Sequence, residues 1–136
     1  ESYLIASTVT CVAGQRVVRK ICPTCRISKV PQKEIVEKMK EVLGGLFDFE
    51  KNKNLKLFEG RGCKECNNTG YLGRIGIFEV LVVSEKIAKM IIARSRPQEI
   101  AKQAVSEGMI TMRQDGFLKV LEGITTVEEV LRVAEE

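Results

Sequence analysis

The sequence predicts an α+β fold in which a four-cysteine metal site closes one lobe and helices form the C-terminal part. Three observations lead to this prediction: two Cys-x-x-Cys brackets, an apolar β-branched segment on the outer side of each bracket, and apolar residues at helical spacing after residue 83. The chain of 136 residues is long enough to bury a moderate core.

Residues 3–13 carry apolar side chains at a spacing of three to four, which predicts a helix with one buried face that ends at Gly14. Within this helix Cys11 should be a small core residue. Residues 15–21 predict a strand, because β-branched residues alternate there with basic ones. This strand leads directly into the first bracket.

The segment between the brackets should leave the metal site and return to it. Pro31 suits the first turn of a helix, and Gly44 with Gly45 should end that helix. Residues 46–54 give no packing signal and predict an exposed loop. Residues 55–58 predict a short strand that returns the chain to the second bracket.

Residues 74–83 form the clearest strand of the sequence, and their nearly continuous apolar character predicts burial on both faces. A metal ion shared by the two brackets would hold the end of strand 15–21 beside the start of strand 74–83. The two strands should therefore pair, and they should run antiparallel.

The last 53 residues predict helices. Ser84 is a suitable N-cap for the first, Pro97 lies at the start of the second, and residues 109–121 form a third that Gly116 interrupts. Thr126 precedes the last helix, whose acidic first turn suits the helix dipole. The apolar stripes of these helices predict ordinary core packing.

The brackets place Cys22 with Cys25 and Cys63 with Cys66, and this paired spacing predicts one closed tetrahedral metal site. Zinc prefers four thiolates, and a filled coordination shell leaves no position for water or substrate. The site should therefore stabilise structure and carry out no chemistry. Iron could occupy the same four thiolates, and the sequence does not separate the two metals.

Two other uses of the cysteines are weaker predictions. The Cys-Pro-Thr-Cys bracket could form a thioredoxin-like redox pair at a helix N-terminus, but the second bracket has no role in that scheme. Structural disulfides would need an oxidising compartment, and the sequence shows no secretory signal. A reducing cytosol suits thiols that bind a metal.

The two parts of the chain differ in net charge. Residues 1–83 carry a formal charge of +5, and residues 84–136 carry a formal charge of −1. The basic residues beside the brackets could offset the metal-thiolate charge, or they could form a nucleic-acid surface. We favour the first interpretation and expect no nucleic-acid partner. Five aromatic residues could stack on bases in the alternative: Phe47, Phe49, Phe58, Tyr71 and Phe78.

The sequence lacks several features that catalysis would require. It contains no glycine-rich phosphate loop ending in Gly-Lys-Ser/Thr and no histidine, which excludes a recognisable nucleotide cradle and every Ser-His or Cys-His nucleophile. It also contains no apolar stretch of the length that a membrane helix needs. The chain by itself is therefore not a convincing enzyme, and its opening inside a helical pattern suggests a piece of a longer protein.

Three ordered motifs resemble the C-terminal part of the secretion ATPases of type II secretion and type IV pilus assembly. The motifs are YLIASTVTCVAGQRVVRKICPTCR, GRGCKECNNTGYLGRIGIFEVL and MRQDGFLKVLEGITTVEEVLRV. The resemblance covers nearly the whole chain and is weakest over residues 31–58. It implies that Cys22, Cys25, Cys63 and Cys66 bind zinc in a sub-domain inserted near the end of a RecA-like ATPase core.

The resemblance also implies a domain division and a cellular setting. Residues 1–21 would end the ATPase core, 22–73 would form the zinc-binding sub-domain, 74–83 the returning core strand, and 84–136 a C-terminal helical subdomain or bundle. The parent protein would be a hexameric, cytoplasmic motor that binds ATP and Mg²⁺ and works with inner-membrane platform and adaptor proteins. No catalytic residue of that motor matches a position in this sequence.

Overall fold

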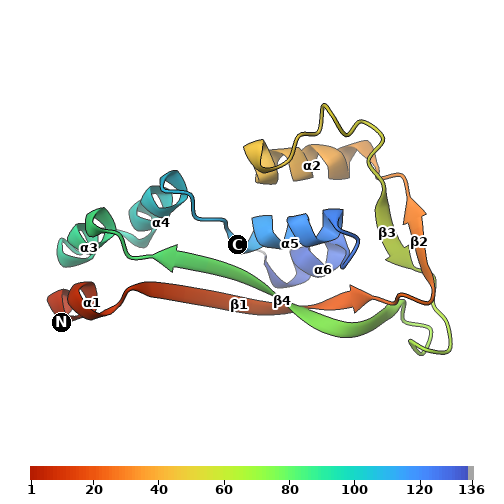
Figure 1. Cartoon of the computed structure of the whole chain (residues 1–136), viewed down its shortest axis with the longest axis horizontal. Helices are drawn as coiled ribbons and strands as arrows, with labels where there is room; N and C mark the ends of the chain where they lie inside the picture. Colours follow the sequence, from red (N-terminus) through yellow and green to blue (C-terminus); the bar gives the residue numbers. More distant parts are fainter. Residues whose placement is uncertain (135–136) are drawn as a thin grey trace. The chain divides into compact units, whose positions relative to one another are not determined.

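The computed structural model describes residues 1–134, which form helices and two small sheets (Figure 1). The helices are α1 (Ser2–Thr8), α2 (Lys33–Leu43), the 3-10 helix η1 (Gly44–Leu46), α3 (Glu85–Ile92), α4 (Pro97–Ser106), α5 (Met112–Leu121) and α6 (Val127–Val133). The strands are β1 (Cys11–Ile21), β2 (Arg26–Lys29), β3 (Leu57–Gly60) and β4 (Tyr71–Val82). The mixed content agrees with the predicted α+β class.

The described residues pack into two compact units, and strands β1 and β4 contribute residues to both. The first unit combines residues 1–15 with 78–111 and contains α1, α3 and α4. The second unit combines residues 16–77 with the segment from 112 onward and contains the cysteine brackets, α2, α5 and α6. The RecA-like assignment, the helical bundle and the domain boundaries remain predictions.

Strands β1 and β4 pair in a two-stranded sheet, which confirms the pairing predicted from the brackets. At one end the Val83 N–H donates to the Thr10 carbonyl at 2.9 Å, and at the other the Cys22 N–H donates to the Gly70 carbonyl at 2.9 Å. The strand arrows in Figure 1 point in opposite directions. The pairing is therefore antiparallel.

The predicted helix over residues 3–13 is too long. Helix α1 ends at Thr8, Val9 is already extended, and strand β1 begins at Cys11. The reason is that Val9, Thr10 and Val12 are β-branched and favour the extended backbone, which here gains hydrogen bonds to β4. Because Cys11 lies on this strand, its side chain is exposed, and the prediction of a core cysteine is wrong.

The predicted burial of both faces of strand 74–83 is also wrong. Phe78, Val80 and Val82 lie on one face of β4, and each is exposed by more than two fifths. Only Ile77 is buried in this strand. Successive side chains of a strand point to opposite faces, and in the described residues the face with the three even-numbered side chains stays partly exposed.

The second sheet joins β2 to β3, with Arg26 opposite Gly60 and Lys29 opposite Leu57 in antiparallel register. The sequence analysis did not predict β2, because its four residues contain a single apolar side chain. It did predict β3, two residues too early. Strand β2 follows the first bracket and strand β3 precedes the second, so both pairs of cysteines lie at the same end of this sheet.

The core of the second unit joins the segment between the brackets to the C-terminal helices. Its buried members are Met39, Leu43, Leu57, Phe117, Val120, Val127 and Val130. Helix α5 runs through Gly116 without a break, which corrects the predicted interruption, and an added Cβ there would lie 2.5 Å from Val130 Cγ1. Gly116 therefore allows α5 and α6 to approach closely.

The predicted N-caps of two helices are confirmed. The Ser84 hydroxyl accepts a hydrogen bond from the Ile87 N–H at the start of α3, and the Thr126 hydroxyl accepts one from the Glu129 N–H at the start of α6. Pro97 is the first residue of α4. Among the described residues, the helices are too short and too polar for any to cross a membrane.

Candidate metal centre

The two brackets bring all four predicted cysteines to one point. The sulfur atoms of Cys22, Cys25, Cys63 and Cys66 all lie within 4.8 Å of one another. The Sγ atoms of Cys22 and Cys63 are 3.8 Å apart, those of Cys25 and Cys66 are 3.8 Å apart, and those of Cys63 and Cys66 are 3.7 Å apart. Cys22 and Cys66 are buried, and the other two are partly exposed.

These distances fit a tetrahedral metal site. Four sulfurs at about 2.3 Å from a central zinc ion lie about 3.8 Å from each other at the tetrahedral angle. A disulfide bond would need about 2.05 Å between two sulfurs, and the cysteines are free thiols here. The four side chains therefore fit a closed thiolate site and do not form a pair of disulfides.

Backbone N–H groups in and around the second bracket point at the sulfurs. The Gly70 N–H donates to Cys66 Sγ at 3.2 Å, the Cys63 N–H to the same sulfur at 3.3 Å, and the Gly62 N–H to Cys25 Sγ at 3.3 Å. Such bonds stabilise thiolate charge and fix the orientation of ligands around a metal.

Two glycines allow the loop of the second bracket to fold back on itself. Gly70 has φ +82°, and a Cβ added there would lie 2.5 Å from the Gly60 carbonyl oxygen. A Cβ on Gly60 would overlap the Gly70 carbonyl oxygen. That carbonyl accepts the Cys22 N–H, so the close contact of Gly60 with Gly70 connects the second bracket to the first.

The thiols have unequal acidities because each one influences the others. Burial raises the pKa of Cys66, but the N–H groups of Cys63 and Gly70 outweigh this effect and lower the pKa to about 6. Burial likewise raises the pKa of Cys22, and backbone N–H groups of Cys25 and Thr24 lower it overall. For Cys63 the Cys66 N–H lowers the pKa, whereas burial and the other thiols raise it to about 11. If all four groups were thiolates, their repulsion in this space would favour the binding of a cation.

The structure does not support a thioredoxin-like use of the first bracket. That use places the first thiol at the N-terminus of a helix. Residues 22–25 instead form a turn that leads into strand β2.

Some basic residues near the brackets have partners other than the sulfurs. The Arg26 guanidinium lies 3.9 Å from the centre of the Phe58 ring, and the Arg19 guanidinium lies 4.2 Å from the centre of the Tyr71 ring. Arg19 also forms an ion pair with Glu129 at 2.7 Å. No local sequence pattern predicts this ion pair, because the two residues are 110 positions apart.

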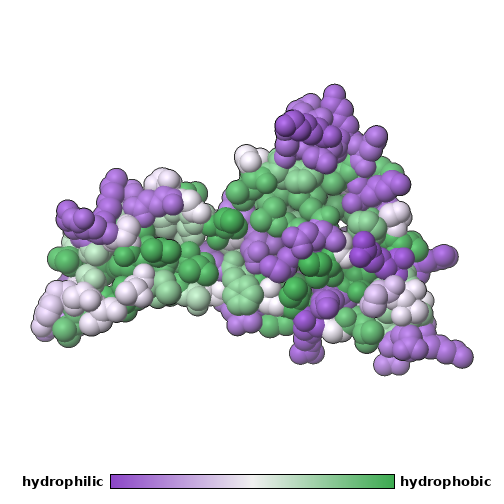
Figure 2. All heavy atoms as spheres, in the orientation of Figure 1, coloured by the Kyte–Doolittle hydropathy of each residue, from purple (hydrophilic) through white to green (hydrophobic). Residues whose placement is uncertain are grey.

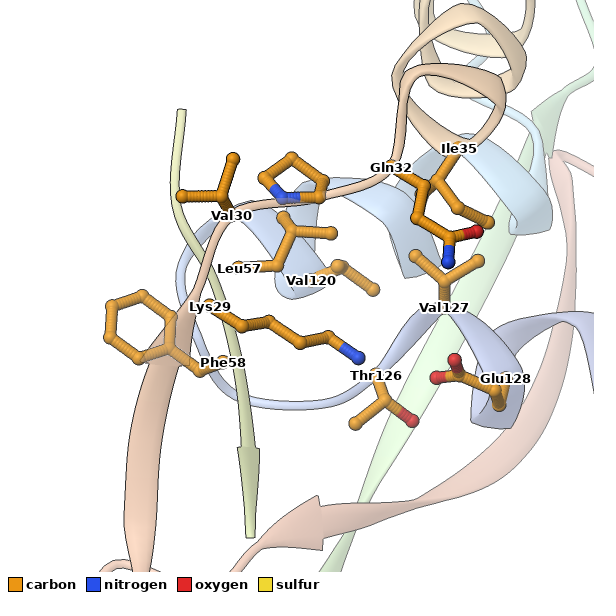
Figure 3. A pocket seen from close by; sticks show the side chains of 11 residues that line it. Lys29, Val30, Gln32, Ile35, Leu57, Phe58, Val120, Thr126, Val127 and Glu128 are labelled. Atoms are coloured by element: carbon orange, nitrogen blue, oxygen red, sulfur yellow. The ribbon is translucent and has the colours of Figure 1, made fainter. Parts of the chain in front are cut away.

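A separate pocket of about 240 Å³ lies between the β2–β3 sheet and helices α2, α5 and α6 (Figure 3). Its floor is apolar and includes Leu57, Val120 and Val127. Its polar members are partly engaged, since Lys29 pairs with Glu59 and the Thr126 hydroxyl bonds to Tyr71.

Comparison with known proteins places these features in one family. The model of the family described as "Type II/IV secretion system protein" matches residues 1–132. The chain is 39% identical over 131 residues to the "Type IV pilus assembly ATPase PilB" of Thermus thermophilus, covering 96% of this chain and 14% of that protein. It is 38% identical over 136 residues to the "Type II secretion system ATPase E" of Vibrio cholerae, covering 100% of this chain and 25% of that protein.

A third relative, the "Type II secretion system protein E" of Pseudomonas aeruginosa, is 39% identical over 136 residues, with 100% of this chain and 25% of that protein covered. The chain thus spans between a seventh and a quarter of the length of these curated relatives. The match over nearly all residues agrees with the resemblance found in the three sequence motifs. The chain belongs to the Type II/IV secretion system protein family.

Proposed function

We propose that this chain is the zinc-stabilised C-terminal module of a motor ATPase that powers type II protein secretion or type IV pilus assembly. The observation that carries the proposal is the tetrahedral spacing of four sulfurs in a chain of this family. ATP and Mg²⁺ would bind elsewhere in the parent protein, because this sequence contains no phosphate loop. The module itself is a structural and protein-interaction element.

In this proposal Cys22, Cys25, Cys63 and Cys66 hold the zinc ion. A zinc ion with four thiolates supplies a cross-link and no open coordination position. The cross-link joins the end of β1 to the loop that precedes β4 and therefore fixes the ends of the segment between the brackets. The N–H groups of Gly62, Cys63 and Gly70 orient the sulfurs and offset their charge.

The apolar surface of the first unit supports docking onto the remaining ATPase core of the same protein. The unit buries Ile87 and Ala104, yet it exposes large apolar side chains on all of its elements, and Figure 2 shows apolar residues at the surface. The exposed residues are Tyr3, Leu4, Ile5, Val12, Phe78, Val80, Val82, Ile92, Val105 and Ile110. Surfaces of this kind are typical of interfaces.

The parent protein would be a homo-hexamer on the cytoplasmic face of the inner membrane. It would contact the platform and adaptor proteins of the secretion or pilus machine and couple ATP hydrolysis to their work. The printed names of the relatives support this setting, because they are type IV pilus assembly and type II secretion ATPases.

The test compares the full-length parent protein with its Cys63→Ser variant and with the 136-residue chain. We expect one zinc ion per chain in the wild-type parent by elemental analysis, ATP turnover by the parent, and no turnover by the 136-residue chain alone. The Cys63→Ser variant should lose the zinc ion. A parent protein without metal, or without ATP turnover, would contradict the proposal.

The alternative of a nucleic-acid-binding module has less support. The rings of Phe47 and Phe49 pack edge to face at 4.7 Å between centres, Arg26 covers Phe58, and Arg19 covers Tyr71. The aromatic rings of the segment between the brackets and of Tyr71 are therefore already engaged within the chain. Salt-dependent binding of the chain to single-stranded DNA or RNA would favour this alternative.

A further inference from the structure

An open hollow of about 480 Å³ on the second unit is lined mainly by arginines. Val17, Val18 and Arg19 of β1, Arg74 of β4 and Arg132 of α6 line it. The hollow is distinct from the cysteine cluster and from the apolar pocket of Figure 3. Three guanidinium groups from three separate elements thus face one space.

Two of these guanidinium groups are held in place by a buried carboxylate. Arg19 donates to Glu129 Oε1 from Nε at 3.0 Å and from Nη2 at 2.7 Å, and its guanidinium also lies on the Tyr71 ring. Arg132 donates from Nε to Oε1 at 3.3 Å and from Nη2 to Oε2 at 2.9 Å. Each guanidinium carries five N–H groups, so both retain donors for a further acceptor.

The charge of the hollow is not balanced by its own residues. The Glu129 carboxylate is 2% exposed and lies between Arg19 and Arg132, whose side chains are 46% and 55% exposed. Arg74 is exposed and forms no ion pair or hydrogen bond of its side chain among the described residues. Three guanidinium groups with one carboxylate leave a net charge of +2 around the hollow.

We propose that this hollow binds the phosphate group of a small molecule. A phosphate dianion offsets a charge of +2, whereas a single carboxylate offsets half of it. Phosphate oxygens also accept several N–H groups at once, and the planar fork of arginine suits this geometry. Arg19 and Arg132 are pre-oriented by Glu129, so phosphate binding needs little further ordering of these two side chains.

The phosphate group can come from free inorganic phosphate or from the phosphates of a nucleotide. Both offer the same oxygens to the three guanidinium groups. This site contains none of the four cysteines, and it goes beyond the function proposed above.

The test titrates inorganic phosphate into the metal-loaded 136-residue chain at constant ionic strength and follows the arginine Nε–Hε signals by NMR. We expect saturable shifts of the Arg19, Arg74 and Arg132 signals. The Arg74→Gln variant should bind phosphate about tenfold more weakly, because it loses charge-assisted hydrogen bonds without disturbing Glu129. Arg74→Lys retains the charge without the fork and should bind with intermediate affinity.

The matched control is Arg16→Gln, since Arg16 is an exposed arginine of strand β1, which pairs with the strand of Arg74, and Arg16 does not line the hollow. This variant should bind phosphate within about twofold of the wild type, because a screened surface charge contributes little. Equal losses in Arg16→Gln and Arg74→Gln would overturn the proposal, as would the absence of saturable binding. Unchanged metal content and melting temperature in both variants show that the comparison concerns folded protein.

Two further titrations separate the sources of the phosphate group. Tighter binding of ADP than of phosphate, lost in Arg74→Gln, assigns the site to a nucleotide, and equal affinities assign it to free phosphate. A tetraglutamate peptide serves as the probe for acidic protein segments. Binding of this peptide without binding of phosphate or ADP would overturn the proposal.

Discussion

Glu129 is the buried charge that fastens helix α6 to strand β1. Its two carboxylate oxygens accept hydrogen bonds from the Arg19 backbone N–H and from the guanidinium groups of Arg19 and Arg132. Burial alone raises the pKa of this carboxyl group, but the two arginines outweigh burial and lower the pKa to about 2. The Glu129 carboxylate is therefore ionised in the folded protein at neutral pH.

This pKa predicts a pH dependence of the Glu129 contribution to stability. The folded pKa of about 2 lies below the ordinary value of 4.5, so the contribution is present above pH 5 or so and is lost as pH falls toward 2. At neutral pH we expect Glu129→Gln to lower the free energy of unfolding by roughly 2–3 kcal/mol. Urea unfolding of both proteins should show this difference shrinking between about pH 5 and pH 3.

The same measurement needs a control, because acid also affects the cysteine site. The wild type and Glu129→Gln both contain the four cysteines, so the difference between their free energies of unfolding reports on Glu129 alone. The variant Glu85→Gln alters a carboxylate whose side chain is 86% exposed and should leave stability almost unchanged. A difference between Glu129→Gln and the wild type that does not change with pH would contradict the assignment of the low pKa.

The cysteines predict a selective effect on metal content. Cys63→Ser removes one of four sulfurs within 4.8 Å and should release the metal, because the thiolate set is then incomplete. Cys11→Ser changes an exposed cysteine outside this cluster and should leave the metal content at one ion per chain. Elemental analysis of the purified variants measures both outcomes, and metal loss in Cys11→Ser would contradict the proposed ligand set.

At the scale of elements, the contact between α5 and α6 depends on the absence of a side chain at Gly116. A Cβ at that position would lie 2.5 Å from Cγ1 and 3.0 Å from Cγ2 of the buried Val130. Alanine would gain about 1 kcal/mol of helix propensity over glycine, but overpacking of a core costs about 1–3 kcal/mol. The cost of overpacking should exceed the gain in helix propensity, because Val130 is fully buried and has little room to move.

We therefore expect Gly116→Ala to destabilise the chain by about 1 kcal/mol in urea unfolding. Val130→Ala should destabilise it by about 2 kcal/mol through a cavity. The double variant should be more stable than the sum of the two losses predicts, because the methyl group added at position 116 can occupy the space that Val130→Ala empties. Additive losses would indicate that Gly116 and Val130 do not share this space.

At the scale of the whole molecule, the metal is expected to stabilise the two units unequally. The brackets belong to the second unit, whose core joins α2, β3, α5 and α6. Helices α3 and α4 belong to the first unit. Loss of the metal should therefore loosen the second unit first, beginning at the loops that contain the cysteines.

A chelator should lower the melting temperature by roughly 10 °C or more, because the binding free energy of a structural metal is also folding free energy. Hydrogen exchange should show a loss of protection within residues 22–73, while amides of α3 and α4 remain protected. Unchanged protection and melting temperature after complete metal removal would rule out the structural role.

Sequence patterns determined the local features of this protein. The spacing of Cys22, Cys25, Cys63 and Cys66 predicted their convergence and the antiparallel pairing of β1 with β4, because one ion shared by both brackets would hold these segments together. Ser84, Pro97 and Thr126 located three helix starts, since capping and proline geometry are local effects. The three motifs also led to the correct family.

Tertiary structure alone decided which faces are buried and which distant residues meet. The apolar run of β4 predicted burial on both faces, but Phe78, Val80 and Val82 are exposed because burial depends on neighbouring layers. Cys11 is exposed because its segment belongs to strand β1 and not to helix α1. The ion pair of Arg19 with Glu129 and the gathering of Arg19, Arg74 and Arg132 depend on three elements folding together, and sequence spacing does not encode such contacts.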